Sequence, residues 1–218
     1  MKQQHGFTLI EIAIVLVVIG LLLGGVLKGQ ALVTQGKIRA VAQELESVAA
    51  SLLNYQSRYQ ALPGDDNRAA GRWSAVNGNL DGNLSGNFNS LTDTDESRLL
   101  WSHVRHAGFI GGDTASLVQP ANAAGGIIGV EMDAGVSGSG STSSIDLPGL
   151  VVCASNLPAK IAEAIDQQSD DGLPGKGSIH GFKQSSSLTL GASSPTDSAS
   201  ASAYVDEANN LYTVCRKV

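Results

Sequence analysis

The stretch FTLIEIAIVLVVIGLLLGGVL, residues 7–27, decides how this chain is organised. Its 21 residues are almost all apolar, and Glu11 is the only charged residue among them. At about 1.5 Å per residue, a helix of this length spans roughly 30 Å, the thickness of the hydrocarbon core of a bilayer. No polar stripe runs around such a helix, so burial in a soluble core is a poor alternative. The stretch therefore predicts a membrane span at about residues 7–27.

Glu11 is an unexpected residue in this apolar run. A carboxylate inside a membrane-length segment costs about 2.5–3.5 kcal/mol even on insertion scales, and it usually marks a function. Protonation would also remove the penalty, and so would a side chain that extends toward the nearer interface. The residues of the span alone leave these interpretations open.

The residues before and after the start of the run resemble a known signature. MKQQHG at residues 1–6, followed by FTLIE at residues 7–11, resembles the leader of the type IV pilin-like family, which includes pilins, minor pilins and type II secretion pseudopilins. The resemblance implies that prepilin peptidase cuts between Gly6 and Phe7 and then N-methylates Phe7. It also implies that Glu11 pairs with the methylated amine of a neighbouring subunit, so that Phe7 and Glu11 act in filament assembly.

Two classes of function follow. The resemblance implies a structural subunit that polymerises through its N-terminal helix, with copies of itself or related subunits, prepilin peptidase and an inner-membrane assembly platform as partners. The resemblance also implies a single-pass precursor in the bacterial inner membrane, with lipid around the span and the head outside the cytoplasm, and a final location in a pilus or a periplasmic pseudopilus. The alternative is a monomeric, membrane-anchored ligand-binding or adhesin-like protein. Lys28 stands where many pilins have a helix-kinking proline, which leaves a pseudopilin or minor subunit open.

An apolar stripe continues beyond the span with spacings of three and four residues, which predicts an amphipathic helix packed on its own domain. The stripe consists of Ile38, Val41, Leu45, Val48, Leu52, Tyr55 and Tyr59. A free-standing coiled coil is the alternative. Pro63 and Gly64 predict the end of the helix. We therefore expect a cleaved leader at residues 1–6, a long helix at residues 7–62 and a globular head at residues 63–218.

The head is expected to contain both strands and helices. Segments rich in β-branched residues at 126–132, 147–155 and 211–218 predict strands. Residues 97–110 and 156–172 predict helices, the second with Gly172 at its end. The resemblance implies a pilin-like α+β fold, in which one long N-terminal helix packs on a C-terminal head with an antiparallel sheet.

Composition and motifs argue against several other classes of protein. The formal net charge is −6, without a run of Lys or Arg, which argues against nucleic acid as the main partner. The sequence has no GxSxG elbow, GxGxxG loop or P-loop lysine. His103 and His106 lie three apart on a predicted helix, but no third ligand is near them in sequence, so packing or surface roles are favoured. Asp65 and Asp66 are expected to cap a turn. We expect no enzymatic activity.

One loop has the chemistry of a calcium site. In DGNLSGNFNSLTD, residues 81–93, oxygen-bearing side chains alternate and Gly86 follows at the sixth position, as in calcium-binding loops. The twelfth position lacks the bidentate Glu of an EF-hand, so Asp93, Asp95 or Glu96 would have to complete the ligand set. The candidate calcium ligands are Asp81, Asn83, Ser85 and Asp93. Calcium sites occur in heads of the resembling family, and a metal-free turn rich in Gly and Asn is the alternative.

The two cysteines, Cys153 and Cys215, lie far apart without a CxxC pattern or a histidine near them in sequence. This spacing argues against a metal or redox motif and leaves one disulfide or two free thiols. The topology implied by the resemblance places the head outside the cytoplasm, where thiols can be oxidised. Many members of the resembling family also close a loop near the C-terminus in this way. We therefore expect a Cys153–Cys215 disulfide.

Overall fold

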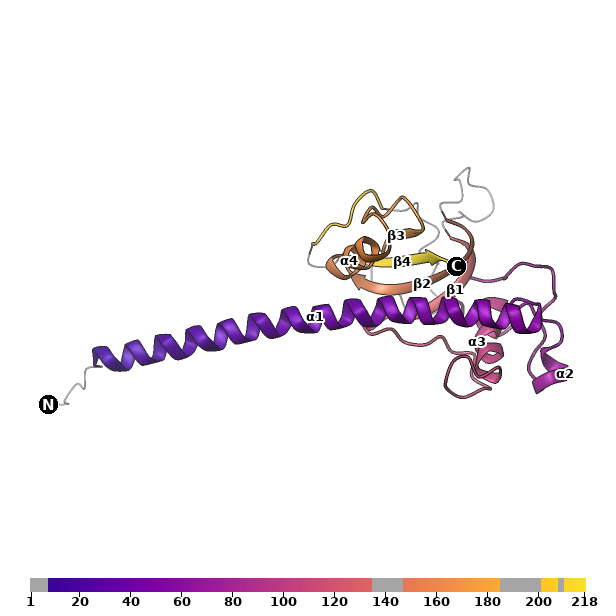
Figure 1. The fold of residues 1–218 in the computed structure, drawn as a ribbon, viewed down its shortest axis with the longest axis horizontal. Coiled ribbons are helices and arrows are strands. Elements are labelled where there is room, and N and C mark those ends of the chain that lie inside the picture. The colour runs from indigo at the N-terminus through magenta and orange to yellow at the C-terminus, as the bar shows by residue number, and fades with distance from the viewer. Residues whose placement is uncertain (1–7, 135–146, 185–200, 208–209) are drawn as a thin grey trace. The chain divides into compact units, whose positions relative to one another are not determined.

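A computed structural model describes residues 8–134, 147–184, 201–207 and 210–218 (Figure 1). The chain divides into two compact units, Met1–Lys37 and Ile38–Val218. In chain order the elements are α1 (Leu9–Tyr59), α2 (Ala69–Trp73), α3 (Glu96–His106), β1 (Ile128–Ala134), β2 (Leu147–Pro158), α4 (Ala159–Ser169), β3 (Ile179–Gln184) and β4 (Leu211–Lys217). A long N-terminal helix followed by a head with an antiparallel sheet confirms the predicted α+β, pilin-like architecture.

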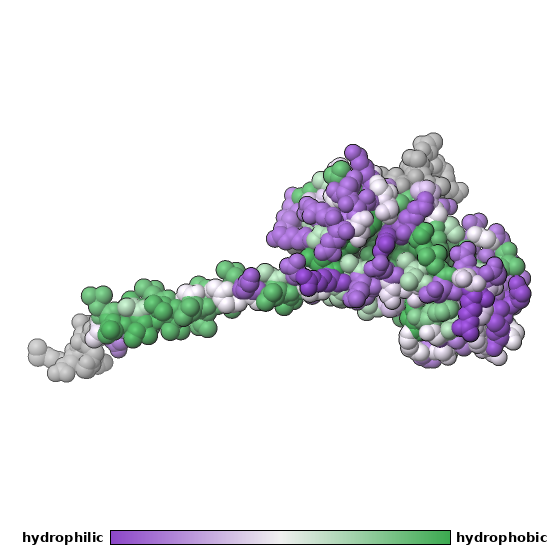
Figure 2. Space-filling model, in the orientation of Figure 1, coloured by the Kyte–Doolittle hydropathy of each residue, from purple (hydrophilic) through white to green (hydrophobic). Residues whose placement is uncertain are grey.

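The first unit contains the beginning of α1. Apolar side chains between Leu9 and Leu27 are largely exposed, with Leu9 at 91 % and Leu27 at 67 %. An 18-residue window of α1 has a mean hydropathy of 2.8, and none of it is buried. Figure 2 shows this part of the helix as an almost continuous hydrophobic surface. By length and composition, α1 is the one helix among the described residues that could cross a membrane.

The second part of α1 lies in the second unit and packs on the head. Its buried residues recur every three or four positions, as one face of a helix requires. They are Ile38, Val41, Leu45, Val48, Ala49, Ser51, Leu52 and Tyr55. The apolar members share one core with Leu100 and Trp101 of α3 and with Val152 of β2. Since full burial of one such side chain contributes about 1.5–3 kcal/mol, this face holds the helix on the head, as the stripe predicted.

The end of α1 directs the chain toward α3. The helix ends at Tyr59, and Gln60 adopts a left-handed φ of 53° while its N–H donates to the carbonyl oxygen of Gln56 (2.9 Å). Gly64 has a φ of 92°, and a Cβ there would collide with the carbonyl oxygen of Glu96. Only glycine fits both requirements. The tight approach brings the segment after α1 against the first residue of α3.

The four strands form one antiparallel sheet in the order β1-β2-β4-β3. Its register aligns Gly129 with Cys153, Cys153 with Cys215, and Cys215 with His180, so these four residues form a row across all four strands. Directly opposed residues in an antiparallel sheet point to the same face. The row therefore defines one face of the sheet.

The two faces of the sheet have different neighbours. One face contributes Val130 and Val152 to the large core that it shares with α1 (Figure 1). The other face carries the two cysteines, and it forms a smaller cluster with Phe88 and Phe182. The predicted strands correspond to β1, β2 and β4, and the predicted helices correspond to α3 and α4, whereas β3 was not predicted.

Candidate functional site

Thr8 and Glu11 form a reciprocal cap at the start of α1. Glu11 Oε2 accepts hydrogen bonds from the backbone N–H of Thr8 (2.9 Å) and from Thr8 Oγ1 (2.8 Å). In return, the backbone N–H of Glu11 donates to Thr8 Oγ1 (3.3 Å). This is a capping box, which satisfies two backbone N–H groups that lack partners within the helix. Sequence reasoning missed this role of Glu11, although the Thr-x-x-Glu spacing signals it.

The Glu11 carboxylate is also placed to meet a second partner. Its side chain is exposed, and both hydrogen bonds shown by the described residues fall on Oε2. A negative charge in the first turn is favoured by the helix dipole, so α1 itself supports an ionised Glu11. Gly6 and Phe7, the predicted processing site, lie outside the described residues. The pairing of Glu11 with the Phe7 amine of a neighbour therefore stays a prediction.

Three carboxylates converge where the segment after α1 meets α3. Oxygen atoms of Asp65, Asp81 and Glu96 all lie within 4.8 Å of one another. Asp65 and Glu96 are almost completely buried, at 2 % and 4 % exposure, while Asp81 is exposed. Backbone N–H groups hold the two buried carboxylates in place. The Asp65 carboxylate accepts the backbone N–H groups of Asp81 (3.1 Å) and Gly82 (2.9 Å), and the Glu96 carboxylate accepts the backbone N–H of Ser85 (2.9 Å). The three side chains form what we call the acidic cluster.

The electrostatics of the acidic cluster favour a bound positive charge. Burial raises the pKa of Asp65, the N–H of Gly82 opposes that rise, and the nearby Glu96 carboxylate adds to it. A cation among the carboxylates would offset both the burial and the mutual repulsion. Hard carboxylate oxygens suit Ca²⁺ better than they suit soft transition metals. The donor set therefore fits calcium.

The acidic cluster contains only part of the predicted calcium ligand set. Asp81, Asn83 and Ser85 line one surface groove of about 430 Å³. Asp93 instead forms an ion pair with Arg98 (2.7 Å). The sequence interpretation gave Asp65 a capping role in a turn, and its side chain does accept turn N–H groups, but its proximity to Asp81 arises only in the folded chain.

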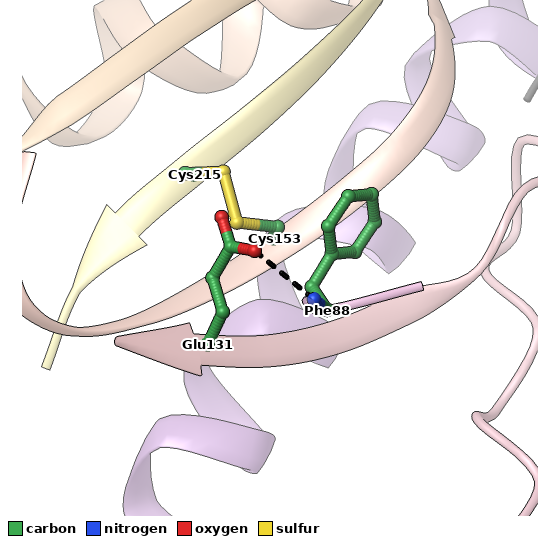
Figure 3. Close-up of a disulfide and its surroundings, with 4 residues drawn as sticks. All are labelled: Phe88, Glu131, Cys153 and Cys215. Atoms are coloured by element: carbon green, nitrogen blue, oxygen red, sulfur yellow. Dashed lines mark hydrogen bonds between the residues drawn. A yellow bond between two sulfur atoms is a disulfide. The ribbon is translucent and has the colours of Figure 1, made fainter. Parts of the chain in front are cut away.

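The predicted disulfide is confirmed. Cys153 and Cys215 are bonded to each other across the β2–β4 pair, with both side chains fully buried. Figure 3 shows the carboxylate of Glu131 directed toward the two sulfur atoms. Glu131 is only 3 % exposed, and its Oε2 accepts the backbone N–H of Phe88 (3.0 Å). The sequence showed a charged residue within a predicted strand, but not its proximity to the cysteines.

His103 and His106 are not brought together as metal ligands. The Nδ1 atom of His103 accepts the N–H of Gly64 (2.9 Å), and its Nε2 lies 2.7 Å from the carbonyl oxygen of Val76. Burial lowers the pKa of His103, which favours the neutral ring that both contacts require. His106 lies against Ser102 instead. Among the described residues, neither histidine belongs to a group of three possible metal ligands.

Comparison with protein families gives one result. Residues 1–27 match the model of the prokaryotic N-terminal methylation motif, the signature of type IV pilins and pseudopilins. The match ends inside α1 and does not extend to the head. Comparison with curated proteins and with solved structures finds no match.

Proposed function

We propose that this chain is a structural subunit of a type IV pilus-like filament (a pilin, minor pilin or pseudopilin) that prepilin peptidase processes and that polymerises through α1. The observation that carries the proposal is that the methylation motif at residues 1–27 includes the exposed apolar start of α1. An apolar surface of this extent needs lipid or protein to cover it. The membrane covers it in the precursor, and neighbouring subunits cover it in the filament.

Glu11 links processing to assembly in this proposal. Cleavage before Phe7 creates a free amine close to the helix N-terminus that Thr8 and Glu11 cap. A carboxylate in lipid is penalised until a cation neutralises it, so pairing with the amine of a neighbour favours docking of the subunit. Thr8 holds the Glu11 side chain against its own helix end through Oε2, and this cap is compatible with the pairing.

Processing gives the first test. Protein purified from its host is expected to begin at Phe7 and to carry one methyl group on that amine. Lys2 is the only charged side chain in the lost segment, so the formal net charge changes from −6 to −7. Intact-mass spectrometry measures this directly, with protein from cells that lack prepilin peptidase as the control. A mass that still includes Met1 to Gly6 when the peptidase is present would contradict the proposal.

The acidic cluster has a subsidiary role in this proposal, as a calcium site that stabilises the head. Asp65, Asp81 and Glu96 supply carboxylate oxygens from the turn after α1, the loop at residue 81 and the start of α3. A Ca²⁺ ion held among them would tie these three segments together. Carbonyl or water oxygens would have to complete the six to eight ligands that Ca²⁺ takes.

Calcium is expected to raise the melting temperature of the full chain in detergent relative to a chelator. A ligand that binds only the folded state adds about 2.7 kcal/mol at 100 times its Kd. Asp81→Asn should abolish the difference in melting temperature between calcium and chelator, because it removes the charge of an exposed member of the acidic cluster. Asp93→Asn is the matched control, since Asp93 pairs with Arg98 instead. Superimposable melting curves across millimolar calcium would rule out the site.

A further inference from the structure

A second group of possible metal ligands lies on the sheet face turned away from α1. A carboxylate oxygen of Glu131 and the Sγ atoms of Cys153 and Cys215 all lie within 4.8 Å of one another. All three residues are buried, and Figure 3 shows the carboxylate directed toward the sulfur atoms. The three come from β1, β2 and β4, so the register of the sheet and not local sequence brings them together.

His180 extends this group onto the fourth strand. It lies directly opposite Cys215 in the β3–β4 register, so its side chain is on the same face as both cysteines. It is 6 % exposed, and its Nδ1 has no hydrogen-bond partner in the part of the chain that the structure describes. A buried imidazole nitrogen without a hydrogen-bond partner is unfavourable, so coordination of a cation by Nδ1 of His180 would remove this cost.

We propose that the reduced head binds a thiophilic divalent cation of the Zn²⁺ class through Cys153, Cys215 and Glu131, with His180 as the fourth ligand. Thiolate, carboxylate and imidazole are the donors that Zn²⁺ takes in tetrahedral protein sites. With bonds of about 2.0–2.3 Å, a tetrahedral ion holds its ligand atoms roughly 3.3–3.8 Å apart. Ligand atoms of Glu131, Cys153 and Cys215 already lie within 4.8 Å of one another, and reduction releases the two sulfur atoms from their covalent bond so that they can separate to this spacing.

The redox state of the cysteines controls this site. In the disulfide, the two sulfur atoms are bonded to each other and offer no thiolate. A phosphine reductant gives two electrons to the S–S bond and becomes a phosphine oxide, taking its oxygen from water, while the two sulfur atoms take up two protons. Zn²⁺ then displaces both thiol protons to the buffer and binds the two thiolates. The oxidised chain carries a covalent link between β2 and β4, and the reduced chain carries a metal link at the same place.

The test uses the full chain in detergent, oxidised or reduced with a phosphine, and zinc chloride as the probe. After gel filtration, the reduced chain is expected to retain one Zn²⁺ and the oxidised chain none. Glu131→Gln and His180→Gln should each weaken binding to the reduced chain by more than about tenfold, the smallest effect usual even for outer-shell partners of a metal. His106→Gln is the control, because His106 lies against Ser102 on α3.

Each remaining outcome decides the proposal. Equal zinc in both redox states, or full affinity in Glu131→Gln, would show adventitious binding and overturn it. If reduction unfolds the chain, Zn²⁺ is expected to restore the circular dichroism of the head, because metal binding is then coupled to folding. Failure of Zn²⁺ to restore the fold would overturn the proposal as well. Co²⁺ bound to the reduced chain should show thiolate charge-transfer absorption, which a site without cysteine ligands would lack.

Discussion

Glu11→Val is expected to leave membrane insertion intact and to abolish filaments. The substitution removes a carboxylate that costs about 2.5–3.5 kcal/mol in the span. It also removes the capping box, a loss of about 0.5–2 kcal/mol, so the net effect on insertion is neutral or favourable. What disappears is the pairing with the amine of a neighbour. At about 4 Å and an effective dielectric constant of about 20, that attraction is roughly 4 kcal/mol, or about a thousandfold in affinity.

Glu11→Gln separates the two roles of this side chain. Glutamine can replace glutamate in a capping box, so the hydrogen bonds with Thr8 are retained while the charge is lost. If charge pairing drives assembly, the Gln variant fails as completely as the Val variant. If Glu11 acts only as a cap, the Gln variant assembles normally. Glu46→Gln, which removes an exposed carboxylate further along α1, is the matched control.

The measurement compares membrane fractions with sheared extracellular or periplasmic filaments from the same cells. Each variant should reach the membrane in wild-type amount, and only the Glu11 variants should lack filaments. A normal filament yield from Glu11→Val would refute the assembly role. A chain that inserts and is processed but never forms filaments, even as the wild type, would favour the monomeric membrane-anchored alternative.

The long helix and its two different halves could be predicted from the sequence because both signals are local. The apolar run of residues 7–27 and the spacing of the stripe from Ile38 to Tyr59 depend only on neighbours along the helix. The capping box of Thr8 and Glu11 is equally local, and it was missed because the carboxylate was considered only as a charge in lipid. The cap and the proposed pairing are compatible, because a carboxylate can accept several hydrogen bonds.

Strand β3 could not be predicted because its sequence, IHGFKQ, has a glycine in the middle and no clear alternation. The structure shows why Gly181 is there. A Cβ at this position would collide with the ring of Tyr204, and the carbonyl oxygen of Gly181 accepts the N–H of Ala201 (2.8 Å). Glycine is thus required at position 181 by contacts with Ala201 and Tyr204, about 20 positions later in the chain. No local sequence pattern can reveal such a requirement.

The acidic cluster was predicted only in part for a similar reason. The alternation of Asp81, Asn83 and Ser85 marks the loop as rich in oxygen ligands, and the structure does place these three along one groove. Asp65 joins Asp81 only because Gly64 allows the chain to turn tightly against Glu96. Ligands from separate segments depend on tertiary packing, so a linear loop motif identifies the region and not the full set.

Removing the disulfide is expected to lower the free energy of unfolding of the head by about 4 kcal/mol. Cys153 and Cys215 are separated by 62 positions, and the chain-entropy model gives about this value for a loop of that length. The bridge restricts the unfolded chain, and it joins the strand next to α4 with the last strand of the chain. For a domain of this size, the loss corresponds to a fall in melting temperature of roughly 8–16 °C.

The variant for this test is the double substitution Cys153→Ala and Cys215→Ala, which leaves no buried thiol. Wild-type protein with and without reductant is the matched pair, because it changes the covalent link and leaves the sequence unchanged. Thermal melts of the full chain in detergent, followed by circular dichroism, report the difference. Peptide mapping without reductant should find the two cysteine peptides joined in host-derived protein. A fall in stability below about 1 kcal/mol would show that the unfolded chain already keeps β2 near β4, since a crosslink then removes little entropy.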